Sequence, residues 1–269
     1  MKSTKKIVAV CGVALVAAGV VSASPTYLVT EGSTLFRASS GGGVQSFALS
    51  DDIVSMFTMP GGEIWAISST ASVNGTFELY RLDGAFSAAP SLTLLYDGFD
   101  STYPGMVFAN GSIYGYRGGS QNLDQINPVS FAVTPVGPTG TFSNGGAAYD
   151  AATDTFWGAS SNTDAIYTVD YSLSNGPTPA STLIGSMGFD FQNHDLDFFN
   201  GTLYAAVQRN DLGTLEVGWI DQMTGAFMTD IVLENVYTPG VVGMVVVPAP
   251  SAAGLLMIGS ALAFGRRRR

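Results

Sequence analysis

The chain has 269 residues, of which 21 are acidic and 11 basic, giving a formal net charge of −10 at pH 7. Seven of the basic residues lie in the first six or last four positions, so residues 24–250 keep four arginines against all 21 acids. Nucleic acid and anionic lipid need a basic footprint and are therefore excluded as partners of this region. The single cysteine, Cys11, lies near the N-terminus, which excludes disulfides, thiol catalysis and cysteine metal sites elsewhere.

Residues 1–23 are predicted to form a helical secretory signal peptide. Three lysines within the first six positions precede an uncharged stretch over 7–21, and small residues follow it. This order is typical of a signal peptide cut after a small residue, here between Ala23 and Ser24. The apolar stretch is shorter than the roughly 20 residues that a spanning helix needs. We therefore expect export through the secretion translocon.

A short pattern recurs along residues 24–246: a turn residue, then a small-residue step, then an aliphatic–aromatic pair. Its copies are Gly62–Ala66, Gly111–Gly115, Asp154–Gly158 and Gly201–Ala205, with a degenerate copy at Ser33–Phe36. From Ile64 through Ile113 and Phe156 to Leu203 the steps are 49, 43 and 47 residues. A period of this length is typical of β-propeller blades.

Each repeat unit is predicted to hold four strands. A short apolar strand comes before the pattern, which is itself the second strand, and Asn-Gly pairs at 110–111 and 200–201 are strong hairpin signals between them. An alternating strand and a last strand follow. Besides the pattern itself, the expected strands are 57–59, 79–83, 92–96, 106–108, 123–127, 132–137, 147–149, 166–170, 182–185, 196–198, 217–221 and 228–233.

These units predict an all-β fold over residues 24–246, a β-propeller of about five four-stranded blades. The unit from Tyr149 to Gly185, with its Tyr-Asp, Ile-Tyr-Thr-Val-Asp and Leu-Ile-Gly segments, resembles the repeats of exported bacterial β-propellers. We expect Val241–Val247 either to close the ring beside the N-terminal strand or to begin a truncated blade, because an open sheet edge invites aggregation. A β-sandwich and a β-solenoid are the alternative folds.

Residues 247–269 form a separate C-terminal tail in this interpretation. Prolines at 248 and 250 prevent a strand from continuing. The uncharged run 251–265 is predicted to be a hydrophobic helix, and Arg266, Arg267, Arg268 and Arg269 finish the chain. Such a basic flank is expected to stay in the cytoplasm.

The tail resembles the PEP-CTERM sorting signal. The matching residues are Val247, Pro248, Pro250, Gly254, Leu255, Leu256 and the four terminal arginines, whereas Ala249 stands where the motif has glutamate. The resemblance implies that an exosortase-type membrane enzyme handles the tail and that the protein reaches the cell surface or extracellular matrix. The alternative is a simple C-terminal anchor, so the tail is either cleaved or retained.

His194 is the only histidine of the chain and lies among acids. Asp190, Asp195 and Asp197 are candidate calcium ligands, because calcium prefers oxygen donors. On a strand Asp195 and Asp197 share one face and His194 lies on the other. The alternative interpretation is a polar strand entry near the mouth of the channel.

The sequence contains no recognisable catalytic constellation. The single histidine leaves a Ser-His-Asp triad possible by count, but no Gly-x-Ser-x-Gly segment positions a serine nucleophile. We therefore expect a non-enzymatic surface or matrix protein whose propeller serves as a binding or spacing module. Extracellular polysaccharide is a candidate partner, and calcium is the one candidate cofactor. A secreted polysaccharide hydrolase or lyase and a calcium-dependent adhesion module are the alternatives.

Overall fold

A computed structural model describes residues 24–120, 122–141, 144–173, 176–234 and 240–248. These residues form β-strands joined by turns, with no helix among them, and none of the described elements could cross a membrane as a helix. The expected signal segment 1–23, including Ala23, and the tail residues 249–269, including Ala249, Pro250 and the terminal arginines, lie outside the described residues.

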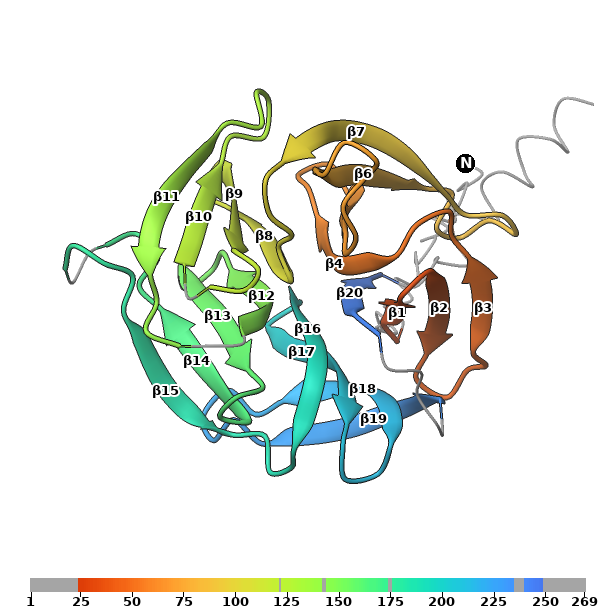
Figure 1. The fold of residues 1–269 in the computed structure, drawn as a ribbon. Helices are drawn as coiled ribbons and strands as arrows, with labels where there is room; N and C mark the ends of the chain where they lie inside the picture. The colour runs from red at the N-terminus through yellow and green to blue at the C-terminus, as the bar shows by residue number, and fades with distance from the viewer. Residues whose placement is uncertain (1–23, 121, 142–143, 174–175, 235–239, 249–269) are drawn as a thin grey trace, which may run out of the picture.

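The described strands form five antiparallel four-stranded sheets arranged around a central axis (Figure 1). From the axis outward, four of the sheets are β4 (Ile53–Thr58), β5 (Ile64–Ser68), β6 (Phe77–Asp83) and β7 (Ser91–Phe99); β8 (Gly105–Ala109), β9 (Ser112–Tyr116), β10 (Asn122–Ile126) and β11 (Val133–Pro138); β12 (Asn144–Asp150), β13 (Thr155–Ser160), β14 (Ala165–Val169) and β15 (Ser181–Ser186); and β16 (Phe191–Phe199), β17 (Thr202–Arg209), β18 (Thr214–Ile220) and β19 (Phe227–Glu234). The five-bladed propeller expected from the repeat is confirmed.

The fifth blade joins the two ends of the described chain. Its order is β20 (Val242–Val247), β1 (Thr26–Glu31), β2 (Thr34–Ser39) and β3 (Gln45–Ala48). The innermost strand β20 pairs antiparallel with β1, so that Thr26 faces Val247 and Glu31 faces Val242. Of the two roles expected for Val241–Val247, closure of the ring is therefore the one adopted. With β20 in place, the fifth blade has four paired strands like the others.

The hairpins between first and second strands follow from local sequence. Asn110 and Gly111 both have positive φ, 46° and 83°, as do Asn200 and Gly201, with 50° and 81°. Two successive positive φ values define the type I′ turn, which matches the twist of antiparallel strands and favours Asn-Gly.

Glycine lets the inner strands approach one another at the axis. A Cβ added to Gly105 in β8 would lie 2.6 Å from the backbone of Gly146 in β12, and one added to Gly146 would lie 2.8 Å from the backbone nitrogen of Leu196 in β16. Gly146 also has φ +70°, which side-chain-bearing residues rarely adopt. Small residues at these positions therefore set how closely the five blades converge.

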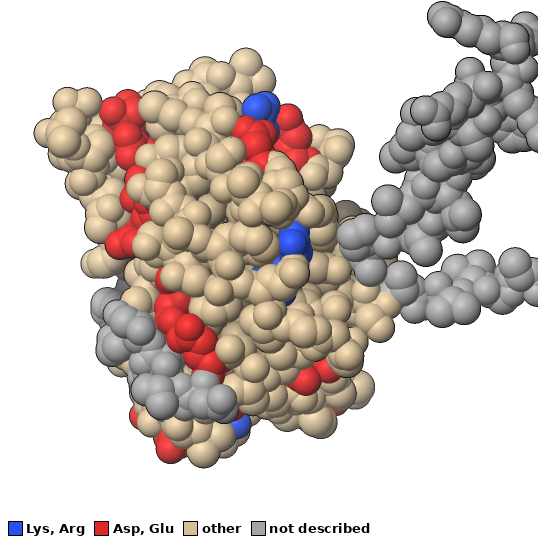
Figure 2. Space-filling model, turned by 90° about the vertical axis from the view of Figure 1, so that its right-hand side faces the viewer, with Lys and Arg blue, Asp and Glu red and all other residues tan. Residues whose placement is uncertain are grey.

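The hydrophobic core lies between neighbouring blades. For example, Trp157 and Ile166 of one blade pack with Leu196, Leu203 and Ile220 of the next in one buried cluster. On the side of the molecule seen in Figure 2, acidic side chains form several groups and few basic ones lie between them.

Candidate functional site

A cavity of about 390 Å³ lies at the face of the propeller where the inner strands begin. Four inner strands line it with residues from their first halves, Val54, Gly145, His194 and Val242, and Pro104 lies just before the fifth. The connections β9–β10 and β13–β14 add Arg117, Ser120 and Ser161. We call this cavity the channel-mouth pocket. Residues from all five blades meet there only because the ring is closed.

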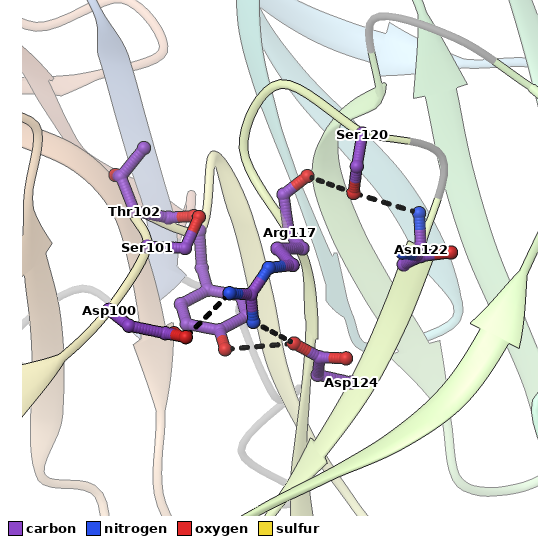
Figure 3. Close-up of polar contacts among 8 residues, drawn as sticks. Asp100, Ser101, Thr102, Arg117, Ser120, Asn122 and Asp124 are labelled. Atoms are coloured by element: carbon purple, nitrogen blue, oxygen red, sulfur yellow. Dashed lines mark hydrogen bonds and ion pairs between the residues drawn. The ribbon is translucent and has the colours of Figure 1, made fainter.

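Arg117 follows β9 and is held by two carboxylates (Figure 3). Its Nη2 lies 2.7 Å from Asp100 Oδ2, and its Nη1 lies 3.2 Å from Asp124 Oδ2. Asp124 is buried and also accepts a 2.9 Å hydrogen bond from the hydroxyl of Tyr103. Hydrogen bonding to Asp100 raises the pKa of Arg117 further. One guanidinium against two carboxylates leaves this corner of the pocket with a small negative charge.

The connection that carries Arg117 is fixed by its own hydrogen bonds. The Ser120 hydroxyl donates to the Arg117 carbonyl at 3.1 Å and accepts the Asn122 N–H at 3.1 Å. The N–H of Gly118 donates to the Thr102 carbonyl at 2.8 Å. The guanidinium is thus positioned from both its backbone and its tip.

His194 is 4% exposed and lies against Gly145 and the ring of Phe191, whose centroid is 4.8 Å from its own. Its Nδ1 lies 3.0 Å from the Gln192 carbonyl. A carbonyl only accepts, so Nδ1 carries the proton and Nε2 of the neutral ring presents a lone pair. Burial lowers the pKa of His194, opposed by the carbonyls of Gln192, Ala159 and Gly145, and the neutral ring is therefore the form present near pH 7.

The Nε2 atom of His194 is buried and makes no hydrogen bond with the residues that the structure describes. The carbonyls of Ala159 and Gly145 are near enough to influence the pKa but not in bonding geometry. Buried polar atoms are nearly always paired. An unpaired nitrogen in a residue that lines a pocket therefore points to a water or a ligand as its partner.

A chain of amides connects the pocket with a buried carboxylate. Asn193, at the rim, donates from Nδ2 to Gln208 Oε1 at 2.8 Å. The Gln208 amide in turn donates to Glu31 Oε1 in the closing blade. Gln208 and Glu31 are both buried, so the orientation of the Asn193 amide is fixed by the adjoining blades.

The predicted calcium ligands do not come together. Asp195 is buried, and its Oδ2 accepts the N–H groups of Met56 in β4 and Met244 in β20, at 3.2 and 2.8 Å. Asp197 Oδ2 accepts the N–H of Val246 at 2.6 Å. Asp190 instead accepts from the Asn210 amide at 2.8 Å.

Asp195 and Asp197 have a structural role: each accepts backbone N–H groups from the free edge of a neighbouring inner strand. The described residues contain no group of three histidine, cysteine or acidic side chains placed to hold a metal ion, so the geometry lends the calcium prediction no support. Burial raises the pKa of Asp195 well above its usual value and that of Asp197 to about 7. His194 lies on the opposite side of the strand, against β12, as alternation predicts.

The remaining site predictions concern the two termini. Val247 is the last residue of β20 and Pro248 follows it, while Ser24 lies exposed just before β1. The sequence did not single out Arg117 or the serines of the pocket. The available signal was weak: Arg117 is one of four arginines between residues 24 and 250.

No family model matches the chain. No curated protein matches it either. Among solved structures, the chain is similar to TolB from Acinetobacter baumannii with 16% identity and a TM-score of 0.48, over 77% of this chain and 52% of that one, so it spans about half of the TolB length. It is also similar to a chain in a nidogen/laminin complex, with 9% identity and a TM-score of 0.52, over 82% of this chain and 98% of that one. At such identities the second likeness shows the fold alone, and that fold is the β-propeller.

Proposed function

We propose that the protein is an exported, non-catalytic β-propeller that binds a ligand at its channel mouth and is displayed at the cell surface or in the extracellular matrix. The observation that carries the binding role is the channel-mouth pocket, whose described lining combines hydroxyls, amides, one fixed guanidinium and a neutral imidazole. These groups form directed hydrogen bonds from a rigid scaffold, and such convergence is typical of binding sites.

Binding is favoured over polysaccharide cleavage by the contacts that the nearby acidic side chains already make. Glycoside hydrolysis requires two carboxyl groups that face the substrate, one of them available to donate a proton. The acids beside the pocket, Asp100 and Asp124, are both ion-paired with Arg117, and Asp124 also accepts from Tyr103. Neither of these two acids is among the residues that line the pocket, so among the described residues no pair of carboxyl groups faces a ligand there.

The export and sorting part of the proposal rests on the two ends of the sequence. The signal-like order in residues 1–23 supports passage through the secretion translocon, and the tail 247–269 supports handling by an exosortase-type enzyme. Because Val247 pairs with Thr26 in the closing blade, a cut between Pro248 and Ser251 would leave the ring intact. A cut before β20 would open it.

The test is intact-mass analysis of the protein recovered from the outside of its native cells, compared with a variant lacking residues 251–269. We expect a mass that begins near Ser24 and ends between Pro248 and Ser251, dependent on the tail. A mass that retains Arg266–Arg269 would replace enzymatic sorting by simple anchoring. The recovered protein should release no reducing ends from matrix glycans, and sustained release would overturn the non-catalytic role.

A further inference from the structure

We infer that the channel-mouth pocket binds a neutral, hydroxyl-rich ligand, a sugar unit, whose hydroxyl donates a hydrogen bond to His194 Nε2. This inference rests on the proposed binding function and deepens it by naming the class of ligand. Two independent observations point to it: a cavity formed by all five blades, and a buried nitrogen without a partner in a side chain that lines the cavity.

The first step concerns the hydrogen bond that His194 can form with a ligand. Its Nδ1–H is committed to the Gln192 carbonyl at 3.0 Å, so Nε2 is an acceptor. Leaving a buried acceptor unpaired costs free energy that a ligand donor recovers. A hydroxyl provides such a donor, and so does a water molecule, which the experiment below distinguishes from a sugar.

The second step concerns charge. Arg117 is more than neutralised by Asp100 and Asp124, so an anion entering the pocket gains no unpaired cation. A cation in turn meets a neutral imidazole and a single net negative charge, carried by carboxylates that Arg117 already engages. Because a charged ligand would lose its hydration without a free counter-charge, a neutral ligand fits this site best.

The third step concerns the other lining groups. The Ser161 hydroxyl can both donate and accept, as sugar hydroxyls do, while Ser120 and Asn193, each with one donor already committed, offer an accepting oxygen. Val54, Pro104 and Val242 form apolar parts of the wall, suited to the C–H faces of a sugar ring. The volume of 390 Å³ lies within the roughly 300–1,000 Å³ of small-molecule pockets.

The experiment uses the processed protein recovered from native cells, titrated by calorimetry and observed by saturation-transfer NMR. The probes are glucose, galactose, mannose and N-acetylglucosamine, with glucuronate and glucosamine as charged analogues. We expect at least one neutral sugar to bind, and its charged analogues to bind about tenfold more weakly or worse. Binding of none of the four neutral sugars would mean that water satisfies His194, and it would overturn the inference, as would tighter binding of glucuronate or glucosamine.

Variants locate the binding. His194→Phe keeps an aromatic ring against Phe191 but removes the acceptor, and should weaken sugar binding about tenfold. Ser161→Tyr fills the pocket from its rim without touching the inner strands and should abolish binding, whereas Asn162→Ala, next in sequence but outside the pocket lining, should leave it unchanged. Each variant is first shown to melt cooperatively near the parent temperature. Binding unaffected by both pocket variants would place the sugar elsewhere and refute the inference.

Failure of the inference and failure of the proposed function give different results. A sugar that binds the pocket while glycans are also cleaved overturns the non-catalytic role and leaves the ligand class standing. Absence of sugar binding from a protein with the expected processed mass overturns the ligand class and leaves export and sorting standing.

Discussion

Replacing Asp195 by alanine should destabilise the propeller strongly, because this carboxylate joins three blades at the axis. It stands on β16, and its Oδ2 accepts N–H groups from β4 and from β20. Its Oδ1 accepts the N–H of Leu196. All of these groups are buried, so alanine would leave the N–H groups of Met56 and Met244 without their acceptor.

The size of the loss can be worked out from these bonds. A buried donor left unsatisfied costs about 1–3 kcal/mol, so the two inter-blade donors together give about 2–6 kcal/mol. This is a large share of the roughly 5–15 kcal/mol that stabilises a typical domain. For a domain of this length each kcal/mol corresponds to about 2–4 °C, so we expect a melting temperature lower by roughly 4–24 °C. Asp195→Asn, which keeps an oxygen where Oδ2 stands, should lose less than half as much.

The measurement is urea and thermal denaturation of the purified variants beside the parent. Asp221→Ala is a matched control, because Asp221 also accepts two backbone N–H groups, from Met223 and Thr224, but at an exposed turn. Water can replace that carboxylate, and we expect a much smaller change than for Asp195→Ala. A loss for Asp195→Ala no larger than for this control would refute the idea that Asp195 holds the blades together.

Three further predictions concern pH, packing and charge. Because the pKa of Asp197 is raised to about 7, the folded state binds its proton more tightly than the unfolded chain does. This contribution to stability is present below about pH 4 and is lost as the pH rises to about 7, amounting to roughly 1–4 kcal/mol for a partly buried group. The parent should thus melt higher at pH 5 than at pH 8, and a melting series in which Asp197→Asn keeps the full difference would contradict this cause. Gly105→Ala places a Cβ 2.6 Å from the backbone of Gly146 and should cost about 1–3 kcal/mol by overpacking, whereas Gly43→Ala, with nothing within 4 Å, should be nearly neutral in the same urea titration. Arg117→Met removes the ion-pair partner of the buried Asp124, leaving it the hydrogen bond from Tyr103, and should cost about 3–5 kcal/mol. Arg81→Met, at a solvent-exposed ion pair, should cost far less. Equal losses in the two variants would argue against a buried role for Asp124.

The architecture could be predicted because its signals are local. Type I′ turns require two positive φ values, and Asn-Gly supplies them at 110–111 and 200–201. The strand segments were found where an apolar pattern marks them, but the inner strands were predicted too short. The segment 196–198 is part of β16 (Phe191–Phe199), and 57–59 marks the end of β4 (Ile53–Thr58).

The inner strands were predicted too short because polar residues interrupt their apolar pattern. Ser55 Oγ accepts the N–H of Met106 in the next inner strand, and Asp195 and Asp197 accept from β20. An inner strand has one edge that no strand of its own blade covers, and side chains from neighbouring blades bond its free N–H groups. A polar residue that looks like the end of a strand in the sequence is therefore required within it.

The sequence by itself determined the repeat, the count of about five blades and the two possible roles of Val241–Val247, because hydrophobic periodicity and turn chemistry act over a few residues. Only the tertiary structure decided the channel-mouth pocket and the part that Asp195 plays. Closing the ring brings Val54, Arg117, His194 and Val242 to one cavity, although as many as 188 positions separate them in the chain. Such convergence depends on the summed curvature of five blades, which no local pattern encodes.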